Sequence, residues 1–334
     1  MLAMIADQAG GPDVLHLADI GMPTPPRGEV LVRLHASGVN YADVMLRAGR
    51  YPGLPGPQRV LGCEGSGCVE AVGPEATRFK VGDRVGVYSP RGGSYAEWMI
   101  APENYVLPLP SSMSFEDAAA MLHVFLTADH ALRALGRGRA GEWVVITAAA
   151  GGVGTALIQL AHASGLKIIG GVGSPDKLAM LRDLGVEHRV DYRAASLSAF
   201  VRNVTAGCGA DLVLESVGGA IFQEGVASLA PLGRLIVFGV ASGERQAVDP
   251  FALHRTSSLL GMLNMSTVFA NRPDLVEASW KELVALYEKG AVRPIISRRF
   301  RLGEVAEAHR LLESRATVGK LVLTIRDESA KGVQ

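Results

Sequence analysis

The sequence predicts an α/β protein in which a β-rich unit is combined with a doubly wound parallel sheet inserted in the chain. At 334 residues the chain is too long for one ordinary core, so two domains are expected. Short β-rich runs punctuated by Gly and Pro fill residues 28 to 110, and strands alternate with helices from about residue 117. The later strands are apolar on both faces, which is typical of a parallel sheet covered by helices on both sides.

The first part is expected to be all-β, because its apolar runs are short and no long amphipathic helix separates them. Its predicted strands are EVLVRLHA, GCVEAVG, DRVGVYS, YAEWMIA and YVLPLP.

The second part alternates strands with helices in the order expected of βαβ units. The predicted strands are EWVVIT, KIIGGV, HRVDY, ADLVLESV and RLIVFGV, and the helices between them are VGTALIQLAHAS, PDKLAMLRDLG, SLSAFVRNVT and AIFQEGVASLA. After Ser257 come the strand SLLGMLN, helices around DLVEASWKELVALYEKG and GEVAEAHRLLESRA, and a last strand KLVLTI. We expect this tail to complete the first domain, which divides the chain into 1–122, 123–257 and 258–334.

Composition argues against several classes of partner. Lys+Arg and Asp+Glu both number 33, so no basic surplus indicates a surface for nucleic acid or membrane. Charges or glycines interrupt every apolar run before the roughly 20 residues that span a bilayer, and the N-terminus lacks the pattern of a secretory signal. Three cysteines without C-x-x-C spacing predict reduced thiols, and we expect a cytoplasmic protein.

A glycine-rich loop follows the buried strand EWVVIT and opens a helix. Ala149, Gly151 and Gly154 occupy the three positions of G-x-G-x-x-G, and Gly152 and Val153 complete the loop. Gly151 lets the backbone approach a pyrophosphate, Gly154 lets the helix pack on the strand, and the helix N-terminus offers free N–H groups. In this βαβ context we interpret the loop as a Rossmann dinucleotide site, although a tight strand-to-helix turn remains the alternative.

The next strand ends without the acid that binds the ribose 2′-hydroxyl of NAD. Gly173 and Ser174 stand there instead, Lys177 follows, and Tyr192 ends the neighbouring strand. Small residues leave space for a 2′-phosphate, and a hydroxyl and an ammonium can bind it. The sequence therefore favours NADPH, although Lys177 has the alternative of an ordinary solvated lysine.

Other residues stand where parallel strands end, at the edge of the sheet along which dinucleotides bind. They are Ser216, Val217, Phe238 and Gly239, with Leu263 and Asn264 as candidates to line the nicotinamide. Ordinary loop packing is their alternative interpretation.

With these motifs assembled, the chain resembles the medium-chain dehydrogenase/reductase superfamily, and specifically its zinc-independent, zeta-crystallin-like quinone oxidoreductase branch. The resemblance rests on GEVLVRLHASGVNYAD, RAGRYP, LGCEGSGCVEAVG, FKVGDRVG, GGSYAEW, AAAGGVG, LVLESVGG and LLESRATVGKLVLTI in this order. It implies a GroES-like β domain for substrate, an inserted Rossmann domain for NADPH, reduction of a small quinone or enone, and a homodimer paired through SLLGMLN. It also implies a cofactor contact for Arg315, for which a surface arginine is the alternative.

The zinc-dependent members of the superfamily hold their metal with a Cys in G-x-C-x-x-D and a His in G-H-E. Here Asn40 replaces the first ligand and Cys63 the second. We expect no metal, because a catalytic zinc needs three protein ligands. Cys63, Glu64 and His123 could still form a residual site, and a satisfied histidine is the simpler interpretation of His123.

Without a Lewis acid, an activated acceptor fits better than a simple ketone. Asn40 and Tyr51 are our candidates, by motif position, to donate hydrogen bonds to the oxygen on which charge develops, and Thr127 is expected beside the nicotinamide. Asn40 could instead cap a helix at YADVMLRAG, Tyr51 could be a packed aromatic, and Thr127 could start a helical turn.

Two other functions stay open at this point. A non-catalytic NADPH-binding scaffold would share the fold and the loop. An enoyl-thioester reductase should carry a basic patch, and Arg298, Arg299 and Arg301 form the clustered candidate, with a solvated strand face as the alternative.

Overall fold

The computed structural model describes residues 1–51, 59–244 and 247–326, which belong to two compact units. The first unit comprises Met1–His123, Ser266–Glu288 and Arg293–Gln334, and the second comprises Val124–Met265 and Lys289–Val292. This division differs from the expected boundary after residue 257 chiefly in one strand, β13 (Leu259–Met262), which belongs to the second unit.

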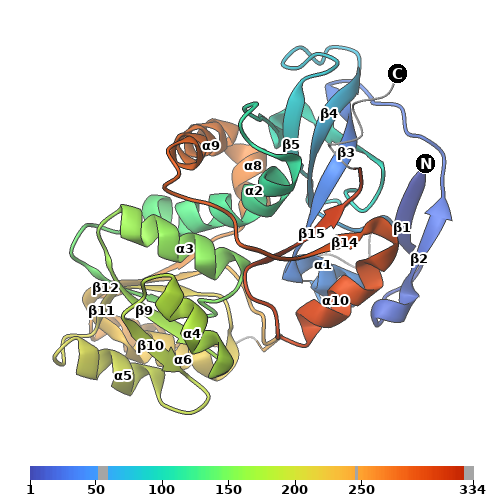
Figure 1. Ribbon diagram of the computed structural model, residues 1–334. Coiled ribbons are helices and arrows are strands. Elements are labelled where there is room, and N and C mark those ends of the chain that lie inside the picture. The colour runs from blue at the N-terminus through green and yellow to red at the C-terminus, as the bar shows by residue number, and fades with distance from the viewer. Residues whose placement is uncertain (52–58, 245–246, 327–334) are drawn as a thin grey trace. The chain divides into compact units, whose positions relative to one another are not determined.

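The first unit is built on a seven-stranded sheet with the order β14-β15-β3-β4-β5-β7, and β6 pairs with β3. The bounds are β3 Glu29–Val39, β4 Glu64–Val72, β5 Arg84–Tyr88, β6 Trp98–Pro102, β7 Val106–Pro108, β14 Ile296–Arg301 and β15 Lys320–Thr324. Figure 1 shows β15, near the end of the chain, in one sheet with the early strands, and it pairs antiparallel with β3. The tail therefore returns to complete the sheet of the first unit.

Smaller elements surround this sheet. A two-stranded sheet joins β1 (Leu2–Ala6) to β2 (Leu15–Asp19). The helices assigned wholly or mainly to this unit are α1 Tyr41–Arg47, α8 Met265–Asn271, α9 Pro273–Glu288 and α10 Val305–Glu313. The strands β1 and β2 and the helix α1 are short, so their periodicity in the sequence is weak.

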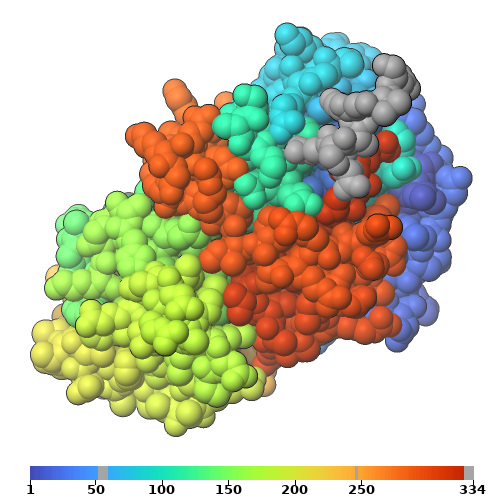
Figure 2. Space-filling model, viewed as in Figure 1, coloured from blue at the N-terminus to red at the C-terminus, as the bar shows by residue number. Residues whose placement is uncertain are grey.

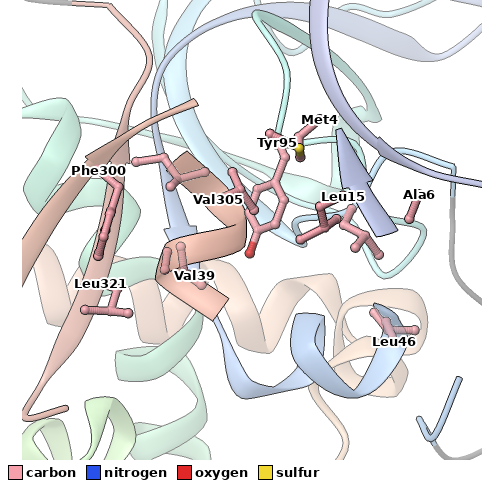
Figure 3. Packing of buried hydrophobic residues seen from close by; sticks show 12 residues of the cluster. Met4, Ala6, Leu15, Val39, Leu46, Tyr95, Phe300, Val305 and Leu321 are labelled. Carbon is pink, nitrogen blue, oxygen red and sulfur yellow. The ribbon is translucent and has the colours of Figure 1, made fainter. Parts of the chain in front are cut away.

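One hydrophobic core of this unit joins its two chain ends. Met4, Leu15, Tyr95, Val305 and Leu321 are buried together in it, and Figure 3 shows Tyr95 beside Val305 and Met4. On the surface in Figure 2 the orange residues of the return segment lie against the blue N-terminal residues. Arg310 of α10 pairs with Asp13.

The second unit is a six-stranded parallel sheet with the order β10-β9-β8-β11-β12-β13. Its strands are β8 Trp143–Ile146, β9 Lys167–Val172, β10 His188–Asp191, β11 Ala210–Glu215, β12 Leu229–Val237 and β13. In chain order this is 3-2-1-4-5-6, the doubly wound order of dinucleotide-binding sheets. The expected α/β architecture is confirmed.

Helices connect these strands as the alternating pattern predicts, and Figure 1 shows them around the sheet. The predicted helices are α3 Gly152–Ala163, α4 Asp176–Asp183, α5 Leu197–Val204 and α6 Gly219–Ala227. A short helix that was not predicted, α7 Pro250–His254, lies between β12 and β13. Residues of α5 and α6, among them Leu197, Val201 and Phe222, share a buried cluster with the strand residues Val145 and Val213.

A longer helix, α2 (Phe115–Asp129), contains the chain's passage from the first unit to the second and is followed by a π-helical segment over His130–Leu135. Its residues are almost continuously buried, so its apolar residues show no clear stripe. Among the described residues, no helix combines the length and the apolar character needed to cross a membrane.

Candidate active site and cofactor loop

The glycine-rich loop lies between β8 and α3, as the sequence predicts. The backbone N–H of Ala149 donates to the carbonyl of Gly171 at 3.0 Å, and that of Gly151 donates to the carbonyl of Ala148 at 2.9 Å. Helix α3 begins at Gly152 and includes Val153. The loop is thus tied to β9, and the N-terminal N–H groups of α3 are available at its end.

Gly154 and Gly151 are required for different reasons. A methyl group on Gly154 would lie 2.5 Å from the carbonyl oxygen of Ala148, closer than real contacts allow. A methyl group on Gly151 would meet only that oxygen, at 3.3 Å. Packing inside the protein therefore explains Gly154, whereas the space at Gly151 fits a group that approaches from outside, such as a pyrophosphate.

The end of β9 is lined by an aromatic ring and a guanidinium. A methyl group on Gly173 would lie 3.1 Å from the ring of Tyr192, 3.4 Å from its hydroxyl and 3.5 Å from Nε of Arg193. Tyr192 is held by its backbone N–H, which donates to the carbonyl of Val172 at 2.9 Å. Tyr192 and Gly173 therefore come together as expected, with Arg193 as an additional cation that the sequence analysis did not select.

Ser174 and Lys177 follow Gly173 in the chain. Both are half-buried, and the N–H of Lys177 donates to the carbonyl of Ser174 at 3.2 Å in the first turn of α4. An ammonium in the first turn of a helix opposes the helix dipole. This position is consistent with a bound anion.

The residues after β11 and β12 form a second stretch of this edge. The N–H of Phe238 donates to the carbonyl of Glu215, and a methyl group on Gly239 would lie 3.1 Å from the carbonyl oxygen of Ser216. The N–H of Leu263 extends the ladder of β12 and β13 to the carbonyl of Val237 at 2.8 Å, and the exposed Asn264 follows. These positions lie at the carboxyl ends of neighbouring strands, as predicted.

Glu215 is a buried carboxylate on this edge that the sequence analysis did not select. Its oxygens accept hydrogen bonds from the N–H groups of Val217 and Gly218 at 2.6 and 3.0 Å. Burial raises the pKa of Glu215, and these backbone donors oppose the rise. Glu215 therefore shapes the loop in which Val217 stands.

The first unit brings Asn40, Glu64 and Lys320 into one buried triangle. Nζ of Lys320 donates to Oδ1 of Asn40 at 2.5 Å and to Oε1 of Glu64 at 2.6 Å. Nδ2 of Asn40 donates to the same Glu64 oxygen at 2.7 Å and to Sγ of Cys63 at 3.3 Å. Lys320 is 4% exposed and Glu64 is fully buried.

The sequence analysis missed Lys320 because it is the first residue of the apolar strand KLVLTI, and a lysine at the end of a strand is usually exposed to solvent. Burial would raise the pKa of Glu64, but the Lys320 ammonium and its hydrogen bond hold that pKa below its ordinary value. Glu64 is thus a carboxylate whose charge is balanced inside the protein.

Asn40 also stands at the N-cap position of α1, as its alternative interpretation predicts. Its backbone N–H donates to Oδ2 of Asp43 at 2.8 Å, so the acid of the first turn closes the helix start. The Asn40 side chain is engaged with Lys320, Glu64 and Cys63 instead.

Asp43 continues into a buried chain of hydrogen bonds. Oη of Tyr95 donates to Oδ2 of Asp43 at 3.0 Å and lies 3.2 Å from Nε2 of His309, whose Nδ1 lies 3.1 Å from Nη1 of Arg47. Because arginine only donates, His309 accepts at Nδ1 and carries its hydrogen on Nε2. Burial raises the pKa of Asp43 to about 6, against the hydrogen bond from Asn40.

Tyr51 lies near the same group, half-buried against the core that contains Leu46 and Tyr95. Burial raises the pKa of its hydroxyl, with smaller contributions from Cys63 and Asp43. The next residues, 52–58, lie outside the described part of the chain.

Thr127 and Arg315 are the remaining predicted site residues. Thr127 is buried within α2 on the side assigned to the second unit, so it lies inside a helix and does not start one. Arg315 is exposed after α10 in the first unit with a left-handed φ of 59°.

The residues Cys63, Glu64 and His123 do not fit a zinc ion. Both oxygens of Glu64 are used, since Oε2 accepts the backbone N–H of His123 at 2.7 Å, and the Lys320 ammonium repels a cation there. Burial, Asp43 and Glu64 raise the pKa of Cys63 well above its ordinary value, whereas zinc binds thiolate. Within the described ranges, no group of three His, Cys, Asp or Glu side chains is arranged to hold a metal.

Family comparisons match both units. The family described as "Alcohol dehydrogenase GroES-like domain" matches residues 26–111, and the one described as "Zinc-binding dehydrogenase" matches residues 184–323. The second description does not carry a metal to this chain, for the reasons given above.

Full-length relatives agree with these matches. The chain is 39% identical to a quinone oxidoreductase of Pseudomonas aeruginosa over 94% of its own length and 96% of the relative's. It is 31% identical to a 2-haloacrylate reductase of a Burkholderia species over 97% and 98%. The crystal structure of Escherichia coli quinone oxidoreductase complexed with NADPH matches with a TM-score of 0.92 and 29% sequence identity. The match covers 97% of this chain and 100% of that chain.

These matches extend over both units and nearly the whole of each relative, so the similarity is not limited to one shared domain. The chain belongs to the quinone oxidoreductase family of the medium-chain dehydrogenase/reductase superfamily.

Proposed function

We propose that this protein is an NADPH-dependent reductase that transfers hydride to quinones or other α,β-unsaturated carbonyls without a metal ion. The observation that carries the proposal is Asn40, which stands at the motif position of the first zinc ligand of related dehydrogenases and is hydrogen-bonded to the buried Lys320 ammonium. Losing a metal removes several kcal/mol of charge stabilisation. A conjugated acceptor compensates, because it spreads the developing charge itself.

The cofactor loop supports a phosphorylated dinucleotide. The backbone at Gly151, where an added methyl group would meet a single oxygen at 3.3 Å, and the start of α3 fit a pyrophosphate. Tyr192 and Arg193 beside Gly173, together with Lys177, supply donors and positive charge for a 2′-phosphate, and β9 ends at Val172 with no carboxylate from there to Ser174. The residues Ser216, Phe238, Leu263 and Asn264 would then line the rest of the dinucleotide.

When bound, NADPH supplies a hydride to the electron-poor carbon of the acceptor. The electron pair of the conjugated system moves to the carbonyl oxygen, and a proton from water completes the hydroquinone or the saturated ketone. Asn40 would donate one N–H of Nδ2 to that oxygen, and the Tyr51 hydroxyl would be a second donor. Thr127 would contact the nicotinamide, and Arg315 would contact the cofactor.

We also expect a homodimer joined through β13. This strand lies at the end of the six-stranded sheet, and Leu259 and Met262 on it are 64% and 71% exposed. An uncovered apolar edge strand is a ready surface for pairing with a second copy. Sedimentation of the native protein and of Met262→Lys tests this, since the charge should produce monomers.

The reductase is tested by following the consumption of NADPH or NADH with purified protein. The acceptors are 1,4-benzoquinone, 9,10-phenanthrenequinone, the enal 2-hexenal, and a saturated aldehyde as the control. We expect turnover of quinone or enal with NADPH, little with NADH, and none of the saturated aldehyde. Activity that a chelator removes and zinc restores would overturn the metal-free chemistry.

The alternatives predict different results. A non-catalytic scaffold would bind NADPH, seen as a change in its fluorescence, without turnover of any acceptor. An enoyl-thioester reductase would prefer a thioester over quinone and enal. The basic cluster expected of the latter is neutralised in part, since Arg298 pairs with Glu307 and Arg299 with Glu116.

A further inference from the structure

The pairing of β15 with β3, and of β3 with β4, places Lys320 beside Asn40 and Glu64. Leu321 of β15 is the register partner of Val39 of β3, and Gly38 of β3 is the partner of Glu64 of β4. Lys320 and Asn40 each stand one residue beyond the Leu321–Val39 pair, so their side chains meet although they are 280 residues apart.

The backbone at Lys320 is also fixed. Its N–H donates to the carbonyl of Ile295 at 2.7 Å, and its carbonyl accepts the hydroxyl of Ser297 at 3.2 Å. Gly319 before it has a φ of +66°, and a methyl group there would lie 2.3 Å from the carbonyl oxygen of Ile295. The backbone from which the Lys320 side chain extends is therefore held in place.

The chemistry of the triangle allows one orientation of the Asn40 amide. An ammonium only donates hydrogen bonds and a carboxylate only accepts them. The amide oxygen must therefore face Lys320, and the NH₂ group must face Glu64 and Cys63. In the reversed amide, NH₂ would face the ammonium and the carbonyl would face the carboxylate.

In this orientation one hydrogen of Nδ2 can be donated to a substrate oxygen. The first is held by the Glu64 carboxylate at 2.7 Å, whereas the second faces the Cys63 sulfur at 3.3 Å, and sulfur is a weak acceptor. A substrate oxygen would replace that sulfur with little loss. The bond from Lys320 to the amide oxygen polarises the group and strengthens its N–H as a donor.

We propose that Lys320 is a positioning residue of this active site: its buried ammonium, balanced by the Glu64 carboxylate, fixes the Asn40 amide with its N–H toward the substrate oxygen. This rests on the proposed reductase function. Lys320 acts through Asn40 and does not touch the substrate.

Lys320→Met removes the charge and keeps the length of the side chain. We expect kcat with quinone to fall by about 100-fold, the size of effect seen when one donor to a developing oxyanion is lost. The KM for NADPH should stay within about twofold, because the cofactor loop belongs to the other unit. Arg299→Met, in the same sheet but with an exposed side chain that pairs with the partly buried Glu116, is the matched control and should keep the wild-type kcat.

A double variant separates positioning from charge balance. In Lys320→Met with Glu64→Gln the buried charges are both gone. The new glutamine must accept from the His123 N–H, so its NH₂ faces Asn40 and favours the reversed amide. We expect the double variant to recover thermal stability while kcat stays low. If the double variant recovered kcat together with stability, Lys320 would serve only to balance the charge of Glu64, and the proposal would be overturned.

A readout independent of turnover completes the test. In ¹⁵N-labelled protein, with the Asn40 side-chain signal assigned by its loss in Asn40→Asp, the NH₂ hydrogens should exchange slowly in the wild type and fast in Lys320→Met. Equal exchange in both proteins would contradict the fixed amide. A wild type that reduces no acceptor would reject the proposed function, and the exchange measurement would still decide whether Lys320 orients Asn40.

Discussion

Tyr95 donates its hydroxyl hydrogen to Oδ2 of Asp43 across 3.0 Å, and both side chains are fully buried although they are 52 residues apart. The same hydroxyl lies 3.2 Å from Nε2 of His309, so it accepts one hydrogen and donates another. This single oxygen joins the start of α1 to α10, two elements from opposite ends of the chain.

Tyr95→Phe should therefore lower the free energy of unfolding by about 1–3 kcal/mol, the cost of leaving buried polar groups unsatisfied. The N–H of His309 loses its acceptor and Asp43 loses a donor. Urea denaturation measures the change. Tyr105→Phe is the control, because within the described chain the Tyr105 hydroxyl has no hydrogen bond, and an equal loss in both variants would refute the role of the Tyr95 hydroxyl.

Stability should fall as the pH drops below about 6.5, because two histidines are buried in their neutral form. Burial and the nearby Arg47 guanidinium lower the pKa of His309 to about 3. Burial lowers the pKa of His123 to about 4. A lowered histidine pKa means that this stability is present above the unfolded pKa of 6.5 and is lost as the pH falls toward the folded value.

Asp43 acts in the opposite direction over part of this range. Its pKa is raised from 3.8 to about 6, so its contribution is present below pH 3.8 and is lost as the pH rises through 6. The two histidines should outweigh it, with His309 alone contributing about 2 kcal/mol of the loss between pH 7 and 5. Urea denaturation of the wild type and His309→Gln between pH 7 and 5 measures this, and parallel curves would show that His309 is not the source.

Gly151 and Gly154 should respond differently to alanine. Gly154→Ala should reduce the melting temperature, because its methyl group collides with the backbone of Ala148 and Ala149. Gly151→Ala should keep the melting temperature and lose NADPH affinity, since its methyl group would stand where the pyrophosphate approaches. Fluorescence titration and thermal melts separate the two effects, and an NADPH affinity of Gly151→Ala equal to that of the wild type would contradict the proposed loop contact.

Arg193→Ala and Lys177→Ala should each raise the KM for NADPH by about tenfold or more, the value of one charge-assisted hydrogen bond to phosphate. The KM for NADH should change little, because NADH lacks the 2′-phosphate. Arg182→Ala is the control, since Arg182 is exposed in α4 and paired with Asp183. Similar losses for both cofactors would reject the assignment of the phosphate site.

Local patterns predicted most of the fold. The loop from Ala149 to Gly154 and the strands and helices of the second unit depend on neighbouring residues, so composition and spacing were enough. The start of α1 was also visible, because Asn40 is of a residue type that commonly caps helices. The β1–β2 pair was not predicted, since short strands leave little periodicity.

The candidate site was predicted only in part, for a physical reason. Asn40 could be chosen from its motif, but Lys320 and His309 gain their roles from strand register and helix packing across the whole chain. Their signals were weak: a lysine opening an apolar strand, and a histidine on the buried face of α10. Arg193 could have been found as the cation directly after Tyr192.

The pairing of β15 with β3 also has a consequence for how the protein is made. Residue 320 emerges from the ribosome long after residues 40 and 64, and the six-stranded sheet is complete in the chain before it. A growing chain therefore holds Asn40 and Glu64 without their cation throughout most of its synthesis. The sheet of the second unit can fold during translation, whereas the triangle of Asn40, Glu64 and Lys320 is assembled only when the last strand docks.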